Sequence, residues 1–75
     1  MSSTIEWLAE RGGIRVGIEP RSDGLFQLHL EGWVPGDIAQ APGHWVATRT
    51  RTLMTDDPGS ARALAEEELA AVFPR

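Results

Sequence analysis

The segment covering residues 57–73 constrains the fold most, because it combines a helix start signal with the periodicity of an amphipathic helix. Asp57 can cap the first free backbone N–H groups, and Pro58 fits the first helical position, where no N–H is needed. Apolar residues then recur at three- and four-residue spacing and form one stripe: Ala61, Leu64, Ala65, Leu69, Val72 and Phe73. Such a stripe must pack against another layer of the protein.

Glu68 interrupts this stripe. At about 100° per residue, its side chain projects inside the arc spanned by Leu64, Ala65 and Val72. We expect Glu68 at the seam between the helix and a sheet, where an arginine would be its natural partner. The alternative is an edge residue whose stem is partly buried and whose carboxylate reaches water.

A second, short helix is predicted near the amino terminus. Ser3 and Glu6 have the spacing of a capping box, in which each side chain reaches a free backbone donor. The helix would cover about residues 4–11 and end where Gly12 or Gly13 supplies a left-handed backbone.

Trp7 projects away from the apolar face of this predicted helix, which Ile5, Leu8 and Ala9 would form. Two roles are open for it. It folds over the chain end or a neighbouring loop, or it anchors a binding partner, because tryptophan is enriched at interface hot spots.

Three strands are predicted between the helices, at residues 14–19, 25–34 and 44–54, because apolar and polar residues alternate there. The turn formers at residues 20–24 predict a hairpin, and residues 35–43 predict a loop. The covered side of the sheet would hold Ile14, Val16, Ile18, Phe26, Leu28, Leu30, Val46 and Thr48. The other side would hold Arg15, Gly17, Glu19, Gln27, His29, Glu31, Trp33, Trp45, Ala47, Arg49 and Arg51.

The predicted fold class is therefore α+β, in the order α-β-β-β-α. A three-stranded antiparallel sheet with both helices on one face would bury every apolar stripe. Residues 1–75 would form a single compact domain, because the chain is too short to divide into two.

The composition narrows the choice of partners. The formal net charge is −4, from 11 Asp and Glu residues against 7 basic residues, all of them arginine. This balance opposes direct binding to phosphate backbones and favours a basic partner. The alternative is that the negative charge serves only to keep the protein soluble. Cysteine is absent, and neither a signal peptide nor a spanning segment is evident, so a cytoplasmic protein without membrane association is expected.

An enzyme is not expected. His29 and His44 could be catalytic or metal-binding, but no Asp, Glu or Cys residues stand around them at ligand spacing. We therefore predict no catalytic residue, no metal and no cofactor.

Two surfaces are candidates for binding. The first is acidic, with Trp7 as an accompanying anchor, and its members are Glu6, Trp7, Glu10, Asp56, Asp57, Glu66 and Glu67. The alternative reading of the carboxylates is a solvated face with favourable charge at a helix start.

The second surface is the open sheet face, where Trp33 and Trp45 flank the long loop and mix with Arg and His, as at interface hot spots. This face could serve protein interaction or self-association. Stacking of single-stranded nucleic acid on Trp33 and Trp45, beside Arg49 and Arg51, is a further alternative that the net charge opposes. The alternative is that this face has no binding role and is simply solvated, with Glu–Arg pairs between neighbouring strands.

The order α-β-β-β-α resembles the topology of double-stranded-RNA-binding domains, but the basic cluster that opens their last helix is replaced here by mainly acidic residues 56–62. The segment 57–69, after a Trp-bearing region of three strands, resembles the closing helix of many small phage proteins. In format the chain is most similar to anti-CRISPR inhibitors of type I systems, which are small, acidic, cysteine-free and compact.

That resemblance implies a monomeric inhibitor in the cytoplasm of the bacterial host. It would bind a Cas subunit of a surveillance complex and occupy a basic DNA-recognition surface with its carboxylates, by DNA mimicry.

Overall fold

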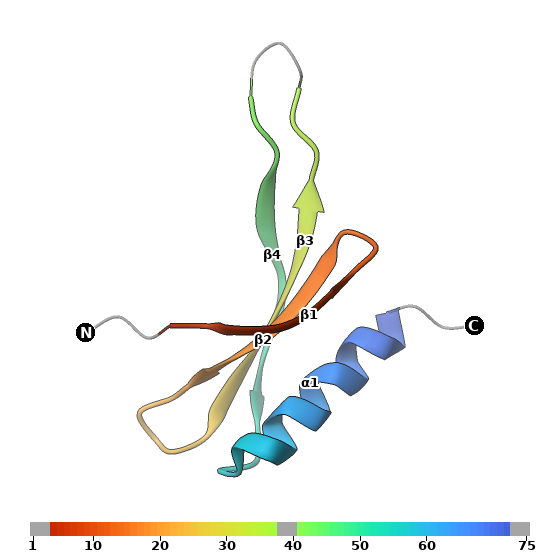
Figure 1. The fold of residues 1–75 in the computed structure, drawn as a ribbon. Helices are drawn as coiled ribbons and strands as arrows, with labels where there is room; N and C mark the ends of the chain where they lie inside the picture. Colours follow the sequence, from red (N-terminus) through yellow and green to blue (C-terminus); the bar gives the residue numbers. More distant parts are fainter. Residues whose placement is uncertain (1–3, 38–40, 73–75) are drawn as a thin grey trace.

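The computed structural model describes residues 4–37 and 41–72, which form one antiparallel sheet and one helix (Figure 1). The described elements follow in the order β1 (Glu6–Arg11), β2 (Ile14–Pro20), β3 (Phe26–Val34), β4 (His44–Leu53) and α1 (Pro58–Val72). The four strands lie in the sheet in the order of the sequence, so the sheet is a simple meander. The predicted α+β class is confirmed.

The predicted three-stranded α-β-β-β-α arrangement is wrong, because the first element is a strand. Gly12 and Gly13 have φ angles of 57° and 78°, and Arg11 pairs with Ile14. A two-residue loop with positive φ at both positions forms a type I′ turn, whose twist matches that of paired strands. The glycines therefore close a hairpin between β1 and β2. The predicted capping box is not formed by Glu6, which begins β1, and Ser3 lies outside the described residues.

A β-bulge explains why residues 4–11 have the apolar spacing of a helix. Trp7 pairs with Gly17 and Ala9 pairs with Val16, so Leu8 is the extra residue. Leu8 and Ala9 both pack against the core. Two adjacent apolar residues on one side break the alternation typical of a strand.

The hairpin predicted at residues 20–24 is confirmed. Gly24 has a φ of 87°, and the backbone N–H of Arg21 donates to the carbonyl of Leu25 at 2.9 Å. The Asp23 carboxylate accepts a bond from the Leu25 N–H at 3.1 Å, which lowers the pKa of Asp23 below its ordinary value of 3.8. This turn fixes the register of β2 against β3.

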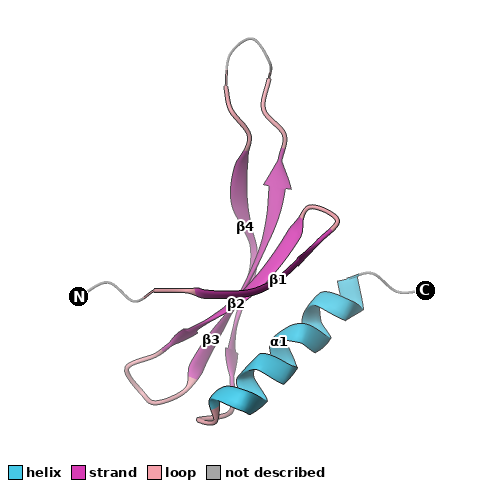
Figure 2. Cartoon of the chain, viewed as in Figure 1, coloured by secondary structure: helices cyan, strands magenta, loops and turns pink. Residues whose placement is uncertain are grey.

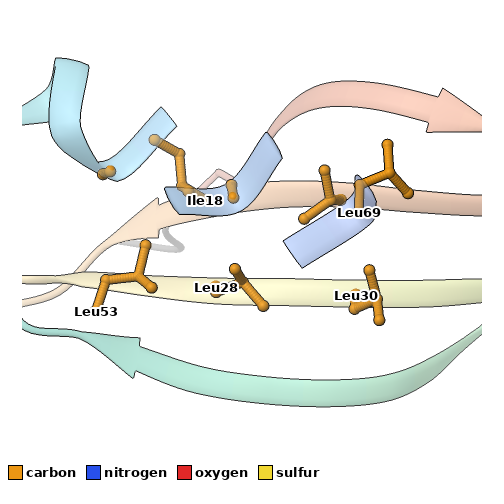
Figure 3. Packing of buried hydrophobic residues seen from close by; sticks show 8 residues of the cluster. Ile18, Leu28, Leu30, Leu53 and Leu69 are labelled. Atoms are coloured by element: carbon orange, nitrogen blue, oxygen red, sulfur yellow. The ribbon is translucent and has the colours of Figure 1, made fainter. Parts of the chain in front are cut away.

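The core lies between the sheet and α1, which packs mainly across β2 with β1 and β3 on either side. Figure 3 shows apolar side chains of β2, β3 and α1 gathered in this layer. The buried members are Val16, Ile18, Leu28, Leu30, Leu53, Ala61, Ala65 and Leu69. The predicted helix and its stripe are confirmed as far as Val72, and Phe73 lies outside the described residues.

A second bulge determines which way the side chains of β4 point. Leu30 pairs with Arg49 and Glu31 pairs with Ala47, so Thr48 is the extra residue. Beyond it, Arg49 and Arg51 lie on the helix side, and Leu53 reaches the core with 2% exposure. The predicted position of Arg49 and Arg51 on the open face is therefore wrong, because strict alternation does not allow for an inserted residue.

The two arginines meet Glu68 of α1. Arg49 Nη1 donates to Glu68 Oε1, and Arg51 Nη2 lies 3.4 Å from Glu68 Oε2. The Glu68 side chain is only 12% exposed. The prediction of Glu68 at the seam with an arginine partner is confirmed, and these ion pairs connect α1 to β4.

The opposite side of the sheet has no covering layer among the described elements. α1 lies against one side of the strands, while the β3–β4 hairpin extends beyond it (Figure 1 and Figure 2). The molecule measures 45 × 39 × 15 Å, and its radius of gyration is 13.7 Å. A compact domain of this length would have a radius of about 11 Å. The fold is therefore thin, with one open face.

Candidate functional site

Three tryptophans gather on the open sheet face. Trp7 of β1 lies across from Gly17 of β2, and Trp33 at the end of β3 pairs with Trp45 at the start of β4. Arg15 of β2 lies among them. We call Trp7, Arg15, Trp33 and Trp45 the aromatic–arginine cluster.

The guanidinium of Arg15 is stacked on two indoles. Its Cζ lies 3.8 Å from the centroid of the Trp7 ring and 4.4 Å from that of the Trp45 ring. Each such contact contributes about 0.5–2 kcal/mol, depending on how far water is excluded. The ring centroids of Trp33 and Trp45 are 5.4 Å apart at an interplanar angle of 69°, an edge-to-face contact. The four side chains thus form one connected group across four strands.

Glu31 fixes the orientation of Arg15. Arg15 donates from Nε at 3.0 Å and from Nη2 at 2.6 Å, and both bonds end on Glu31 Oε1. The two side chains are 25% and 18% exposed. Glu31 neutralises the charge of the Arg15 guanidinium, which also stacks on the rings of Trp7 and Trp45. Arg15 therefore connects these side chains and stabilises the cluster from within the protein.

Two glycines make room for the indoles. A Cβ at position 17 would lie 2.8 Å from Trp7 Cε3 and 2.8 Å from the backbone carbonyl oxygen of Glu6. A Cβ at position 43 would lie 2.2 Å from Trp33 Cζ2. The backbone N–H of Trp33 also donates to the carbonyl of Gly13 at 2.7 Å. The Trp7 and Trp33 rings are therefore positioned by the backbone before any partner binds.

The cluster remains partly open to solvent. Trp7 is 36% exposed and Trp33 is 45% exposed, while Trp45 is half-buried between its neighbours. Large apolar side chains with this exposure, grouped on one face, are typical of interaction surfaces.

The charged groups around the cluster are mainly acidic. Strand register places Glu10, Glu19 and Glu31 on this face with Arg15, and Arg21, which is paired with Asp23, reaches the same face from the β2–β3 turn. These four carboxylates outnumber the two guanidinium groups by two. His29 Nε2 lies 2.9 Å from Glu19 Oε1. Toward the β2–β3 turn, Arg21 Nη1 donates to Gln27 Oε1 at 2.8 Å and to Thr52 Oγ1 at 3.2 Å.

The predicted acidic residues are divided among several locations. Glu6 lies on the helix side and accepts bonds from Arg62 at 2.9 and 3.3 Å, which lower the pKa of Glu6 and raise that of Arg62. Glu10 lies on the open face across from Arg15. Glu66 and Glu67 are exposed on α1.

Asp57 caps α1, as the sequence predicts. Its Oδ2 accepts a bond from the Ser60 N–H at 2.7 Å, and its carbonyl accepts one from the Ala61 N–H at 2.9 Å. The Ser60 bond lowers the pKa of Asp57 below its ordinary value of 3.8. Asp56 precedes it and is exposed. Of the predicted site residues, the structure brings Trp7 and Glu10 to the open face and leaves the others elsewhere.

The set considered for stacking of single-stranded nucleic acid is not assembled. Trp33 and Trp45 lie on the open face, whereas Arg49 and Arg51 lie on the helix side and bind Glu68. The Thr48 bulge separates the two pairs. The sequence places Arg15 and Glu31 on the open face, and the hairpin at residues 20–24 predicts them to lie opposite each other, but neither was among the predicted site residues.

Within residues 4–37 and 41–72, no group of three or more His, Cys, Asp or Glu residues is placed to hold a metal ion. The described helix is also not long and apolar enough to cross a membrane.

Comparison with known protein families, with curated proteins and with solved structures finds no match for this chain.

Proposed function

We propose that this protein is a non-enzymatic binding module that recognises another protein through its open sheet face, with the aromatic–arginine cluster as the anchor. The observation that supports this most is the stacking of Arg15 between Trp7 and Trp45 beside a Trp33 ring that remains 45% exposed. Tryptophan and arginine dominate interface hot spots, and rings that are already positioned lose little conformational entropy on binding.

The charge of the face favours a protein over a nucleic acid. Phosphate recognition requires cationic side chains that release counterions. The one arginine in the cluster is neutralised by Glu31, and the surrounding groups are mainly carboxylates. The exposed indoles therefore have an acidic rather than a basic border.

The test compares partner recovery by tagged wild-type protein and by the double variant Trp33→Ala/Trp45→Ala. Met54→Ala is the matched control, because Met54 is 83% exposed and apolar but lies outside the cluster. Proteins recovered by wild type are identified by mass spectrometry, purified and titrated by calorimetry. The proposal expects the double variant to bind a recovered partner at least about tenfold more weakly, as loss of a hot spot requires. Equal affinity of wild type and the double variant would contradict it.

Inhibition of a type I CRISPR surveillance complex is the specific activity that the sequence resemblance suggests, and we retain it as a second proposal. Glu66 and Glu67 are exposed on the outer surface of α1. Outside the open face, they are the carboxylates best placed to contact a basic Cas subunit. The test measures target-DNA binding by a purified surveillance complex with and without the protein. Inhibition that is lost in Glu66→Lys/Glu67→Lys but kept in Trp33→Ala would support DNA mimicry by α1, whereas no inhibition would exclude it.

A further inference from the structure

We infer that the occupant of the open face is an arginine-bearing segment of the partner protein, whose guanidinium stacks on Trp33 and bonds to Glu31. This inference rests on the proposed binding role of that face. It names the chemistry of the partner and the two side chains that would recognise it.

The protein already contains one example of the contact. Arg15 places its guanidinium 3.8 Å from one indole centroid and 4.4 Å from another. Such stacking favours a planar, weakly hydrated cation, and arginine fits it better than lysine does. Trp33 is oriented edge to face with Trp45 and is the most exposed of the three tryptophans in the cluster. A second guanidinium can stack there in the same way.

Glu31 supplies the matching acceptor. Both bonds from Arg15 end on Oε1, so Oε2 can accept from a second donor. Glu31 and Trp33 are two positions apart on β3, and their partners Ala47 and Trp45 confirm that the two side chains lie on the same face. A guanidinium over Trp33 would therefore lie within reach of a carboxylate, and a charge-assisted bond adds to the stacking.

The charge of the wider face agrees with a cationic occupant. Glu10 is exposed next to Arg15 in the register of β1 and β2, and Glu19 lies farther along β2. A second copy of the chain would bring the same excess of carboxylates against itself, and an acidic segment would be repelled. Like charges brought together across an interface weaken binding, whereas opposite charges steer it.

The experiment is a titration of the three indole N–H signals by two-dimensional NMR, with short capped peptides as probes. The peptides share one length and a glycine background, and carry two arginines, two lysines or two glutamates. The signals are assigned with single Trp→Phe variants. The inference expects the arginine peptide to move the Trp33 signal most, to bind about threefold or more tightly than the lysine peptide, and to weaken as salt is raised.

Two variants test the named contacts. Because Trp33→Leu removes the Trp33 signal itself, binding to this variant is measured from the Trp7 and Trp45 signals, whose response to the arginine peptide should be mostly lost. Circular dichroism should show a folded protein, because the Trp33 ring is not part of the buried core. Glu31→Gln keeps an acceptor for Arg15 and should weaken the arginine peptide about threefold or more by removing the charge. Glu67→Gln, on the outer surface of α1, is the matched control and should leave the titration unchanged.

Three outcomes of the peptide titration would overturn the inference. These are a Trp33 signal that does not respond to the arginine peptide, an equal response to the glutamate peptide, and indole shifts that depend on protein concentration without peptide, which would place a second copy on the face. The proposed function fails on a different result, namely partner binding that is indifferent to Trp33→Ala/Trp45→Ala. A partner that depends on the cluster but has no arginine at the contact would leave the function standing and overturn only the inference.

Discussion

At the scale of single residues, Gly43 determines where the Trp33 ring lies. We predict that Gly43→Ala displaces this ring, because the added Cβ would approach Trp33 Cζ2 to 2.2 Å and Cε2 to 2.8 Å. The atoms that must move are at the far end of a side chain, so the free energy of unfolding should fall by no more than about 1 kcal/mol. The measurement is the indole N–H shift of Trp33 together with urea denaturation.

Gly59→Ala is the control for this change, since position 59 lies in α1 at the opposite side of the fold. It should leave the three indole signals in place. An unchanged Trp33 signal in Gly43→Ala would contradict the description of the cluster as positioned by the backbone.

Glu68 is the second residue whose replacement is informative. We predict that Glu68→Gln lowers the free energy of unfolding by about 1 kcal/mol, because two charge-assisted contacts to Arg49 and Arg51 lose the charge of their acceptor. The expected loss of stability is small because the side chains of Arg49 and Arg51 are 59% and 51% exposed, and water weakens their ion pairs. Urea denaturation measures it. Glu67→Gln, at the neighbouring exposed position, should change stability by less than about 0.5 kcal/mol, and equal effects at both positions would sink the claim.

Sequence reasoning located the Glu68 contact but not its cause. The helical period alone places Glu68 inside the apolar arc, and that predicts an arginine partner. Arg49 and Arg51 can be identified as the partners of Glu68 only when the Thr48 bulge is known, because a bulge shifts every later side chain to the other face. The alternation of apolar and polar residues does not reveal this bulge. The same bulge allows Trp45 to lie on the open face and Leu53 to lie in the core.

At the scale of secondary-structure elements, β1 shows how pairing overrides local preference. The predicted helix followed from the capping-box spacing of Ser3 and Glu6 and from the apolar positions Ile5, Leu8 and Ala9, and Glu, Leu, Ala and Arg in residues 6–11 are compatible with a helix. A helix of two turns is marginal by itself, whereas the strand pairs with β2 and places Leu8 and Ala9 against the core. The Gly12–Gly13 pair before an alternating strand was the available signal for a hairpin.

This hairpin gives a prediction about Gly13. Its φ of 78° is a backbone conformation that costs an alanine about 1–2 kcal/mol, so Gly13→Ala should destabilise the protein by that amount. Gly13→Asn should cost less, because asparagine tolerates this conformation. The two variants are compared by thermal and urea denaturation. Equal stability of Gly13→Ala and wild type would be incompatible with a type I′ turn at this position.

The start of α1 gives a prediction about pH. The Ser60 N–H bond lowers the pKa of Asp57 in the folded state, so its contribution to stability is fully present above the ordinary value of 3.8. That contribution is lost as the pH falls through the lowered pKa. Asp23, and Glu6 with an ordinary value of 4.5, act with the same sign. Stability should therefore decrease as the pH is lowered from about 5 to about 3.

The variant Asp57→Asn distinguishes the contribution of Asp57 to the acid sensitivity from the contributions of Asp23 and Glu6. Asparagine still accepts the Ser60 bond but does not titrate, so the dependence of the urea midpoint on pH should become shallower than in wild type. The same slope in both proteins would show that the charge of Asp57 does not contribute to the acid sensitivity.

At the scale of the whole molecule, the fold is one helix on one side of a four-stranded sheet, 15 Å thick. The α+β class and the covered side of the sheet follow from the apolar patterns of β2, β3 and α1. The number of strands does not, because it depends on β1. The open face could be anticipated in outline, from Trp33, Trp45, Arg15 and Glu31, but the addition of Trp7 to it requires the β1 hairpin.

The two binding proposals use opposite sides of the molecule. An interaction through the open face uses Trp7, Trp33 and Trp45, whereas DNA mimicry by α1 uses Glu66 and Glu67 on the other side of the sheet. A partner of ordinary interface size would contact one side of so thin a molecule and leave the other in solvent.

The most direct measurement is therefore a map of NMR chemical-shift changes over the whole protein when an arginine-bearing partner, or the arginine peptide, is added. We predict that the largest changes occur at the aromatic–arginine cluster and Glu31, with α1 almost unaffected. Changes concentrated at Glu66 and Glu67 of α1, with the three indole signals unmoved, would contradict the assignment of the open face as the binding surface.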